Sequence, residues 1–321
     1  MNSVLNIDFE KEADKICDGI RRAMAENLGR RGLVLGMSGG IDSSVCSALA
    51  VRALGKERVL GILMPEQDSS SESSDLGKLL AEHLGIRYET QNISGALESL
   101  GCYRWRDDAI REVVPEYADG WKNKIVIRGG MDGQINRYEL VVEDPAGNRQ
   151  QVRLPIKPYL QIVAATNFKQ RIRKTLEYCW ADRLNYAVLG TPNRLEYDQG
   201  FFVKHGDGAA DLKPIAHLYK SQVYAMARHL NLPAPICNST PTTDTYSLAQ
   251  GQDEFYFALP YQKMDVAVFA LNAEWSTEKL AKEIDVSQEQ AAWIFSDILR
   301  KRKTTRYLHE APVLLEAVSL E

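Results

Sequence analysis

Near its N-terminus the sequence reads Leu33-Val34-Leu35-Gly36-Met37-Ser38-Gly39-Gly40-Ile41-Asp42-Ser43-Ser44. An apolar run over 33–35 predicts a buried strand, and the apolar residues 45–50 that follow predict a helix. A glycine turn between a strand and a helix N-terminus forms a cradle for phosphate, because the backbone can approach closely and the free N–H groups favour an anion. A carboxylate at Asp42 suits such a place only if it holds a cation. The stretch therefore predicts a site for a nucleotide bound with a metal.

Two common phosphate-binding loops do not fit this stretch. A Walker A loop ends in Gly-Lys-Ser/Thr and a Rossmann loop reads G-x-G-x-x-G, and neither pattern is present. An ordinary glycine- and serine-rich helix cap is the simple alternative, but six matching positions after an apolar strand favour the cradle. The pattern S-G-G-x-D-S resembles the pyrophosphate loop of the ATP pyrophosphatases. That superfamily cleaves ATP between the α and β phosphates and includes NAD, GMP and asparagine synthetases and tRNA thiolation enzymes.

Composition limits the classes of function. The 321 residues are 45% hydrophobic and 26% charged with a net charge of −4, which indicates a globular protein and no nucleic-acid partner. Five widely spaced cysteines without a C-x-x-C pair favour reduced thiols over disulfides or zinc. The N-terminus is charged and no apolar run approaches the length of a membrane span, so we expect no signal peptide, no membrane association and a cytoplasmic location.

Short apolar segments alternate with amphipathic ones along most of the chain. This rhythm predicts an α/β fold with a doubly wound parallel sheet, and its strands are expected at 33–35, 59–64, 86–90 and 186–189. Helices are expected at 8–28, from 73 to 84, at 161–184, at 219–230, and after a capping box at Ser287 and Gln290. Ligands lie at the carboxyl ends of parallel strands. The cradle, Met64 and Gly190-Thr191 would meet there.

Residues 102–157 interrupt the alternation. Three short β-like segments, at 125–127, 138–142 and 151–154, surround a turn at 144–147 and predict an antiparallel element. We therefore divide the chain into an ATP pyrophosphatase domain, 1–101 with 158–321, and an inserted β element, 102–157. A flap that covers a sheet edge is the preferred interpretation of the insertion, and a lid or partner surface is the alternative.

A second group of motifs follows the strand expected at 186–189. The segment 190–196 reads G-T-P-N-R-L-E, and 201–211 reads F-F-V-K-H-G-D-G-A-A-D. Together with N-F-K-Q-R-I-R at 167–173, K-S-Q at 220–222 and P-T-T-D at 241–244, these motifs resemble the NAD synthetase family in order and spacing. The resemblance covers about residues 8–100 and 160–310 and leaves the β element out.

The resemblance implies an amide-forming reaction driven by ATP. A carboxylate, the nicotinate of deamido-NAD in that family, attacks the α-phosphorus, pyrophosphate leaves, and ammonia resolves the acyl adenylate. The matching positions imply that Asp42 and Glu196 bind Mg²⁺, that Arg171, Lys204 and Asp211 bind the dinucleotide, and that Asp42, Ser43 and Lys220 serve catalysis. The implied ATP-binding residues are Gly36, Met37, Ser38, Gly39, Gly40, Ile41, Asp42, Ser43, Ser44, Met64, Thr191, Lys220 and Thr242. For Asp42 a plain helix N-cap remains the competing role, and for Glu196 a solvated acid at a helix start.

The segment 192–195 departs from the family's usual G-T-D-x-A-x-E, because Pro192 replaces a carboxylate and Arg194 adds a cation. An amide ligase for a different carboxylate therefore stays open, beside a nucleotide-binding protein without catalysis and a tRNA thiolase. The thiolase is disfavoured because it requires reactive cysteines and a basic face. One helix before the cradle is too short for a glutaminase, so we expect free ammonia or a separate ammonia-supplying protein. The family also implies a homodimer.

Overall fold

The computed structural model describes residues 2–129, 137–240, 245–251, 256–257 and 259–319. Its centre is a parallel sheet with the strand order β3-β2-β1-β7. The strands are β1 (Leu33–Gly36), β2 (Val59–Leu63), β3 (Arg87–Thr90) and β7 (Ala187–Val188). From β1 the chain winds outward to β3 and then returns to the other side of β1 as β7. The direction of winding reverses between β1 and β7, which is where sheets of this kind bind ligands.

Side chains of the sheet alternate between two hydrophobic clusters, as the period of a strand requires. Leu33 and Leu35 pack into one cluster with α1 (Phe9–Arg22), α2 (Ile41–Leu54), α3 (Ser71–Leu84) and α8 (Lys220–His229). Val34 points to the other cluster, with α4 (Ser94–Ser99), α5 (Cys102–Arg111) and the 29-residue α6 (Ile156–Leu184). These three residues of β1 are fully buried. Each contributes roughly 1.5–3 kcal/mol by leaving water, so the strand that carries the cradle is firmly anchored.

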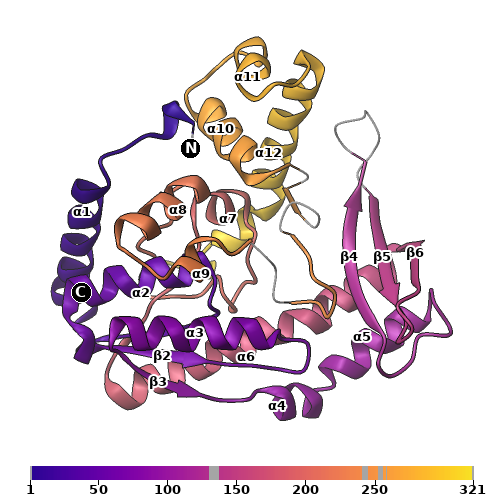
Figure 1. Ribbon diagram of the computed structural model, residues 1–321, viewed down its shortest axis with the longest axis horizontal. Coiled ribbons are helices and arrows are strands. Elements are labelled where there is room, and N and C mark those ends of the chain that lie inside the picture. The colour runs from indigo at the N-terminus through magenta and orange to yellow at the C-terminus, as the bar shows by residue number, and fades with distance from the viewer. Residues whose placement is uncertain (1, 130–136, 241–244, 252–255, 258, 320–321) are drawn as a thin grey trace.

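The antiparallel sheet stands beside this core (Figure 1). It consists of β4 (Lys122–Arg128), β5 (Arg137–Glu143) and β6 (Arg149–Arg153), in that order. One face of the sheet packs against α5 and the first turns of α6 around a cluster that contains Ile125, Leu140 and Ile162. The segment 102–157 therefore contains a helix as well as strands. That helix belongs partly to the main core, since Cys102 and Tyr103 pack with the residues under the parallel sheet.

The remaining helices are α7 (Arg194–Gln199), α9 (Ala234–Cys237), α10 (Tyr261–Asn272), α11 (Thr277–Ile284) and α12 (Gln288–His309). The last three form a separate helical cluster, which also buries Leu5 and Leu195. Short 3₁₀ turns lie at Ser3–Leu5 and Lys56–Arg58, and α1 continues as a π-helical turn, Ala23–Leu28. Within the described ranges, no helix has the length and apolarity that crossing a membrane requires.

The predicted α/β fold with a doubly wound parallel sheet and an antiparallel element is confirmed. Every strand expected from the sequence is present, with ends within three residues of the expectation. Two helices begin earlier than expected from the sequence. The helix expected from 161 begins at Ile156, because Pro155 precedes it in an extended conformation and starts the helix without needing its own N–H. The helix expected from Ser73 begins at Ser71, where Ser70 caps it.

Candidate active site

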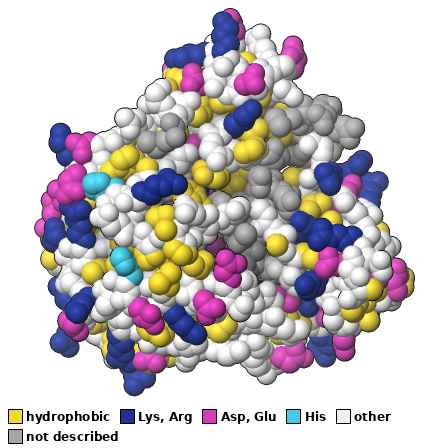
Figure 2. All heavy atoms as spheres, viewed as in Figure 1, with side chains coloured by type: hydrophobic (Ala, Val, Ile, Leu, Met, Phe, Trp, Pro, Cys, Tyr) yellow, Lys and Arg dark blue, Asp and Glu magenta, His cyan; other side chains and the backbone are white. Residues whose placement is uncertain are grey.

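A cleft of about 1320 Å³ opens at the carboxyl ends of the parallel strands. The antiparallel sheet also borders it through β4, β5 and the residues just before β4. Charged side chains of both signs are interspersed over most of the face shown in Figure 2, so this face carries no large region of one sign. Most residues expected in the site line the cleft: Gly36, Met37, Ser38, Gly39, Gly40, Ile41, Asp42, Ser43, Met64, Arg171, Thr191, Glu196, Lys204 and Lys220.

Two expected residues, Ser44 and Asp211, do not line the cleft. Ser44 is buried behind the cradle, where its hydroxyl donates to the Gly40 carbonyl over 2.8 Å. Asp211 accepts from the Val188 N–H over 2.7 Å and from the Tyr178 hydroxyl over 3.2 Å, and it is not among the cleft-lining residues. Thr242 lies outside the described residues.

The cradle has the backbone geometry that an anion site requires. Gly39 has a φ of +72°, and a Cβ there would lie 2.6 Å from the Ser73 carbonyl oxygen, so only glycine fits. No side chain caps the N-terminus of α2 at Gly40. The Ser43 hydroxyl donates to the Gly40 carbonyl over 3.0 Å and lies 3.2 Å from the Ser38 hydroxyl. The N–H groups of the first turn of α2 and their dipole therefore face the cleft, and no side-chain cap from the described residues covers them.

Three helix N-termini bring their charged residues together beside the cradle. Asp42 is the second residue of α2, Glu196 the third residue of α7 and Lys220 the first residue of α8. The Lys220 ammonium pairs with the Asp42 carboxylate, whose other oxygen accepts from the Asn193 side-chain amide over 3.0 Å. The backbone N–H of Asn193 donates in turn to Glu196 over 3.1 Å, closing a capping box at the start of α7. The predicted metal carboxylates and the predicted catalytic lysine thus form one connected group.

Lys220 is held in a defined position and charge state. Its side chain is 2% exposed. Burial favours the neutral amine, but the charges of Asp42 and Glu196 outweigh it and place the pKa of Lys220 above its usual value. The Asp265 carboxylate fixes the backbone, accepting from the N–H groups of Lys220 over 3.1 Å and Ser221 over 2.7 Å. Burial raises the pKa of Asp265 to about 6. Lys220 therefore presents a permanent positive charge on a rigid helix start.

Two of the acceptor residues expected from the motifs, Arg171 and Lys204, also border the cleft. Arg171 Nε donates to the Lys204 carbonyl oxygen over 3.3 Å, which ties the backbone of Lys204 to α6. The Lys204 ammonium donates to the carbonyl oxygens of Tyr307 over 2.7 Å and Glu310 over 3.2 Å at the end of α12. The Lys204 ammonium is thereby held at the C-terminal end of this helix.

Several buried groups in the cleft were not predicted. Lys174 and Glu177 form an ion pair of 2.7 Å one turn apart on α6, and a Cβ on Gly36 would meet the Glu177 carboxylate at 2.9 Å. Burial raises the pKa of Glu177 and also that of Asp207, which accepts from the Val203 N–H. The i, i+3 spacing on a helix was the available signal for the pair. It does not distinguish a buried pair from a solvated one.

The unusual segment 192–195 has a structural role. Asn193 caps α7 and bonds Asp42, as described above, and it is fully buried. The Arg194 guanidinium pairs with Asp198 over 3.2 Å and is not among the cleft-lining residues. Pro192 and Arg194 are the two departures from the family motif, and of these only Pro192 borders the cleft.

The parallel sheet, the glycine cradle at the end of β1 and the carboxylates beside it define a nucleotide-binding α/β protein of the adenine nucleotide alpha hydrolase-like fold. The family model for NAD synthase matches residues 12–114 and 135–308, so the chain belongs to the NAD synthase family. The match includes most of the segment 102–157 and leaves 115–134 out.

Relatives match over nearly the whole chain. An NH(3)-dependent NAD(+) synthetase of Rhizobium meliloti (strain 1021) is 55% identical over 98% of this chain and 94% of its own length. A solved NH3-dependent NAD synthetase of Campylobacter jejuni, in complex with nitrate, is 25% identical, has a TM-score of 0.63, and covers 97% of this chain and 100% of its own. The NMN synthetase of Francisella tularensis has a TM-score of 0.66 at 21% identity, with coverage of 96% and 99%, and shows the shared fold alone.

Proposed function

We propose that this chain is an ammonia-dependent NAD synthetase, a ligase that forms a C–N bond. It converts deamido-NAD, ATP and ammonia into NAD, AMP and pyrophosphate. The family membership and the relatives named for this activity support the proposal. The observation that carries it is the cradle at the end of β1, with Asp42 and Lys220 paired at its mouth. The same relatives favour deamido-NAD over the different carboxylate that the segment 192–195 left open.

The cradle residues bind and orient the leaving group. The N–H groups at the start of α2 and the hydroxyls of Ser38 and Ser43 surround the place where a pyrophosphate would lie. The Lys220 ammonium is close enough to this place to pair with Asp42 at the second helical position. Negative charge moves toward the pyrophosphate as the bond to the α-phosphorus breaks, and fixed donors stabilise that charge without reorganising. Met64 and Thr191 border the same part of the cleft, and we assign them to the nucleotide as well.

The donor chemistry of the site fits Mg²⁺. Among the described residues, no three or more potential metal-binding side chains form a group. The candidate metal ligands are therefore the two carboxylates beside the cradle, Asp42 and Glu196. Magnesium is usually bound by one or two carboxylates together with substrate phosphates, so two are sufficient. The Asp42 carboxylate already pairs with a cation, the Lys220 ammonium, which supports its assignment as a cation ligand. When bound, Mg²⁺ would neutralise phosphate charge and polarise the α-phosphoryl group.

We assign Arg171 and Lys204 to the acceptor dinucleotide, because both residues border the cleft and the Arg171 guanidinium holds the backbone of Lys204. Asp211 is assigned to the same ligand on the motif alone. In the structure its carboxylate accepts from the Val188 N–H and so holds the backbone of β7.

Replacing Arg171 or Lys204 with alanine is expected to raise KM for deamido-NAD by about 10- to 100-fold, since each charge-assisted contact is worth roughly 1.5–3 kcal/mol. KM for ATP should change little. Steady-state kinetics with each substrate varied in turn measures both. Arg183→Ala serves as the control, because Arg183 is exposed on the same helix and rests against Trp180 away from the cleft. A larger effect on KM for ATP would show that the assignment of these cations is wrong.

Two further points of the proposal concern partners. The family implies a homodimer, and we propose that the chain functions as one. We also propose that ammonia is used directly, either free or delivered by a separate protein, as the names of the relatives indicate for those enzymes.

The test is product formation by the purified chain. With ATP, Mg²⁺ and deamido-NAD, ammonium salts should support formation of NAD and pyrophosphate at least about tenfold better than glutamine at equal concentration. Nicotinate mononucleotide and simple aromatic carboxylates, offered in place of deamido-NAD, should give little pyrophosphate. Equal use of glutamine would reveal an amidotransferase activity, and preference for another carboxylate would replace deamido-NAD as the substrate.

A further inference from the structure

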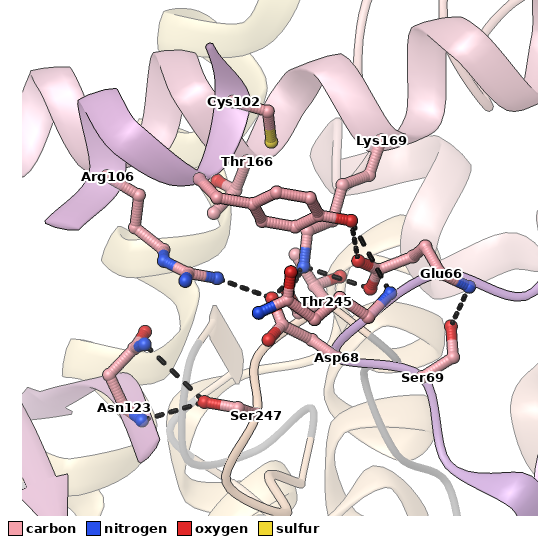
Figure 3. Close-up of polar contacts among 12 residues, drawn as sticks. Glu66, Asp68, Ser69, Cys102, Arg106, Asn123, Thr166, Lys169, Thr245 and Ser247 are labelled. Carbon is pink, nitrogen blue, oxygen red and sulfur yellow. Dashed lines mark hydrogen bonds and ion pairs between the residues drawn. The ribbon is translucent and has the colours of Figure 1, made fainter. Parts of the chain in front are cut away.

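One buried lysine next to the cleft has no part in the reaction described above. Lys169, on α6, is fully buried. Its ammonium makes three contacts to two segments that are far apart in the sequence (Figure 3). The distances are 3.0 Å to Glu66 Oε1, 2.6 Å to Asp68 Oδ2 and 2.8 Å to the Thr245 carbonyl oxygen. All three of its hydrogens can therefore be satisfied within the protein.

The same two carboxylates are also held from α5. The Tyr103 hydroxyl donates to Glu66 Oε2 over 2.8 Å, and the Arg106 guanidinium pairs with Asp68 (Figure 3). Glu66 and Arg106 are each 5% exposed. Each acid is thus placed between one basic or hydroxyl group of α5 and the lysine of α6, so the loop that carries both acids is clamped between two helices.

That loop forms part of the cleft wall. It begins directly after Met64 and Pro65 at the end of β2, and Asp68 and Ser69 border the cleft. The Ser69 N–H donates to the Glu66 carbonyl over 3.0 Å, and the Ser69 hydroxyl accepts from the Glu66 N–H over 3.2 Å. Arg173, one turn beyond Lys169 on α6, donates to the same hydroxyl over 3.3 Å. The turn 66–69 therefore has a single shape, fixed from α5 and α6.

The third contact of Lys169 belongs to another wall of the cleft, the segment 245–250. From Ser247 onward this segment runs along β4 of the antiparallel sheet. The Asn123 N–H donates to the Ser247 hydroxyl over 2.9 Å, the Leu248 N–H donates to the Asn123 carbonyl over 3.1 Å, and the Lys124 ammonium donates to the Ala249 carbonyl over 3.1 Å. Lys169 and the antiparallel sheet hold the segment at its two ends.

A buried charge of this kind is poorly explained by stability. Removing an ammonium from water is costly, and apolar residues of similar volume often replace buried ion pairs without loss of stability. The network instead fixes the relative positions of two walls that border one cleft. We propose that Lys169 is a positioning residue of the nucleotide site, which holds the turn 66–69 and the segment 245–250 in the arrangement that binds ATP. The antiparallel sheet is the second support of that arrangement. Only the choice of ATP as ligand rests on the proposed function.

The experiment compares Lys169→Met with the triple variant Lys169→Met/Glu66→Gln/Asp68→Asn, in which the two acids that lose the lysine are also neutral. Calorimetry gives the dissociation constant of Mg·ATP, thermal melting gives Tm, and hydrogen–deuterium exchange reports on peptides 64–70 and 245–250. We expect both variants to bind Mg·ATP at least about tenfold more weakly, as displaced positioning groups do, with faster exchange in both peptides. The triple variant should regain much of the Tm that Lys169→Met loses.

Lys301→Met is the matched control, because Lys301 forms an ion pair of 2.7 Å with Asp297 and its side chain is only 12% exposed. It should lower Tm without changing exchange in the two peptides or affinity for Mg·ATP. The proposal is overturned if the triple variant regains both Tm and ATP affinity, which would make Lys169 a charge-balancing residue. It is also overturned if exchange in the two peptides matches the wild type. A wild-type chain that binds Mg·ATP but does not amidate deamido-NAD would contradict the proposed function and leave this test intact.

Discussion

Asp42→Asn should lower kcat for pyrophosphate release by about 10³-fold or more. The carboxylate lies within an anion cradle and is the residue that links the cradle to Lys220 and, through Asn193, to Glu196. Its charge is needed to hold a cation beside the phosphates, and a metal's contribution to the transition state is several kcal/mol. The value of kcat is measured in an assay that couples pyrophosphate release to a spectroscopic signal.

Stability must be measured beside this activity, because the substitution leaves the buried Lys220 ammonium without its nearest carboxylate. Breaking a buried pair by removing one partner is costly. The double variant Asp42→Asn/Lys220→Met removes both charges and is the control. It should melt close to the wild type and remain inactive. Turnover of Asp42→Asn within tenfold of the wild type would contradict the assignment of Asp42 to the metal.

Lys220→Met should lower kcat by about 10²- to 10³-fold, the range measured when one fixed donor to a developing negative charge is removed. The effect on stability should be smaller than for Asp42→Asn, since Asp42 is 16% exposed and keeps its hydrogen bond from Asn193. Lys220→Arg keeps the charge and should recover part of kcat. A Lys220→Met variant with unchanged kcat would show that the ammonium only balances the charge of Asp42.

The pH profile provides a second check on Lys220. Its pKa lies above the usual value for lysine, so the folded protein keeps the ammonium charged as pH rises through the normal range for that group. Activity should therefore show no loss between about pH 9.5 and pH 11 that is absent from Lys220→Arg. The wild type and Lys220→Arg are compared under conditions in which both remain folded.

The cradle was predictable because its signals are local. A strand, a glycine turn and a helix start follow one another within twelve residues of sequence, and Gly39 has the positive φ that such a turn needs. The parallel sheet was predictable for the same reason, since its strands are short and three of them, β1, β2 and β7, are apolar. Motif order then indicated that Glu196 and Lys220 lie near Asp42, and the structure places the three helix starts together.

The parts that were missed depend on contacts between distant segments. Asn193 was read as one residue of an altered motif, but its side chain spans from α7 to Asp42. Lys169 lies in the motif at 167–173, but the motif assigns it no role. Its partner Glu66 is 103 positions before it and its partner Thr245 is 76 positions after it. Helical spacing shows that a charged residue lies on one side of a helix, but not whether another segment covers that side. That the antiparallel sheet borders the cleft could not be predicted either, because it also depends on contacts between distant segments.

The most direct test of the proposed function follows one oxygen atom. Deamido-NAD labelled with ¹⁸O in the nicotinate carboxylate is incubated with the purified chain, ATP, Mg²⁺ and ammonium, and the products are analysed by mass spectrometry. Attack of the carboxylate on the α-phosphorus, followed by ammonia, must leave one ¹⁸O in AMP and one in the amide of NAD. Label in AMP, with none in pyrophosphate, is the predicted result. AMP or ADP without label, in a reaction that still forms NAD, would contradict adenylation of the carboxylate.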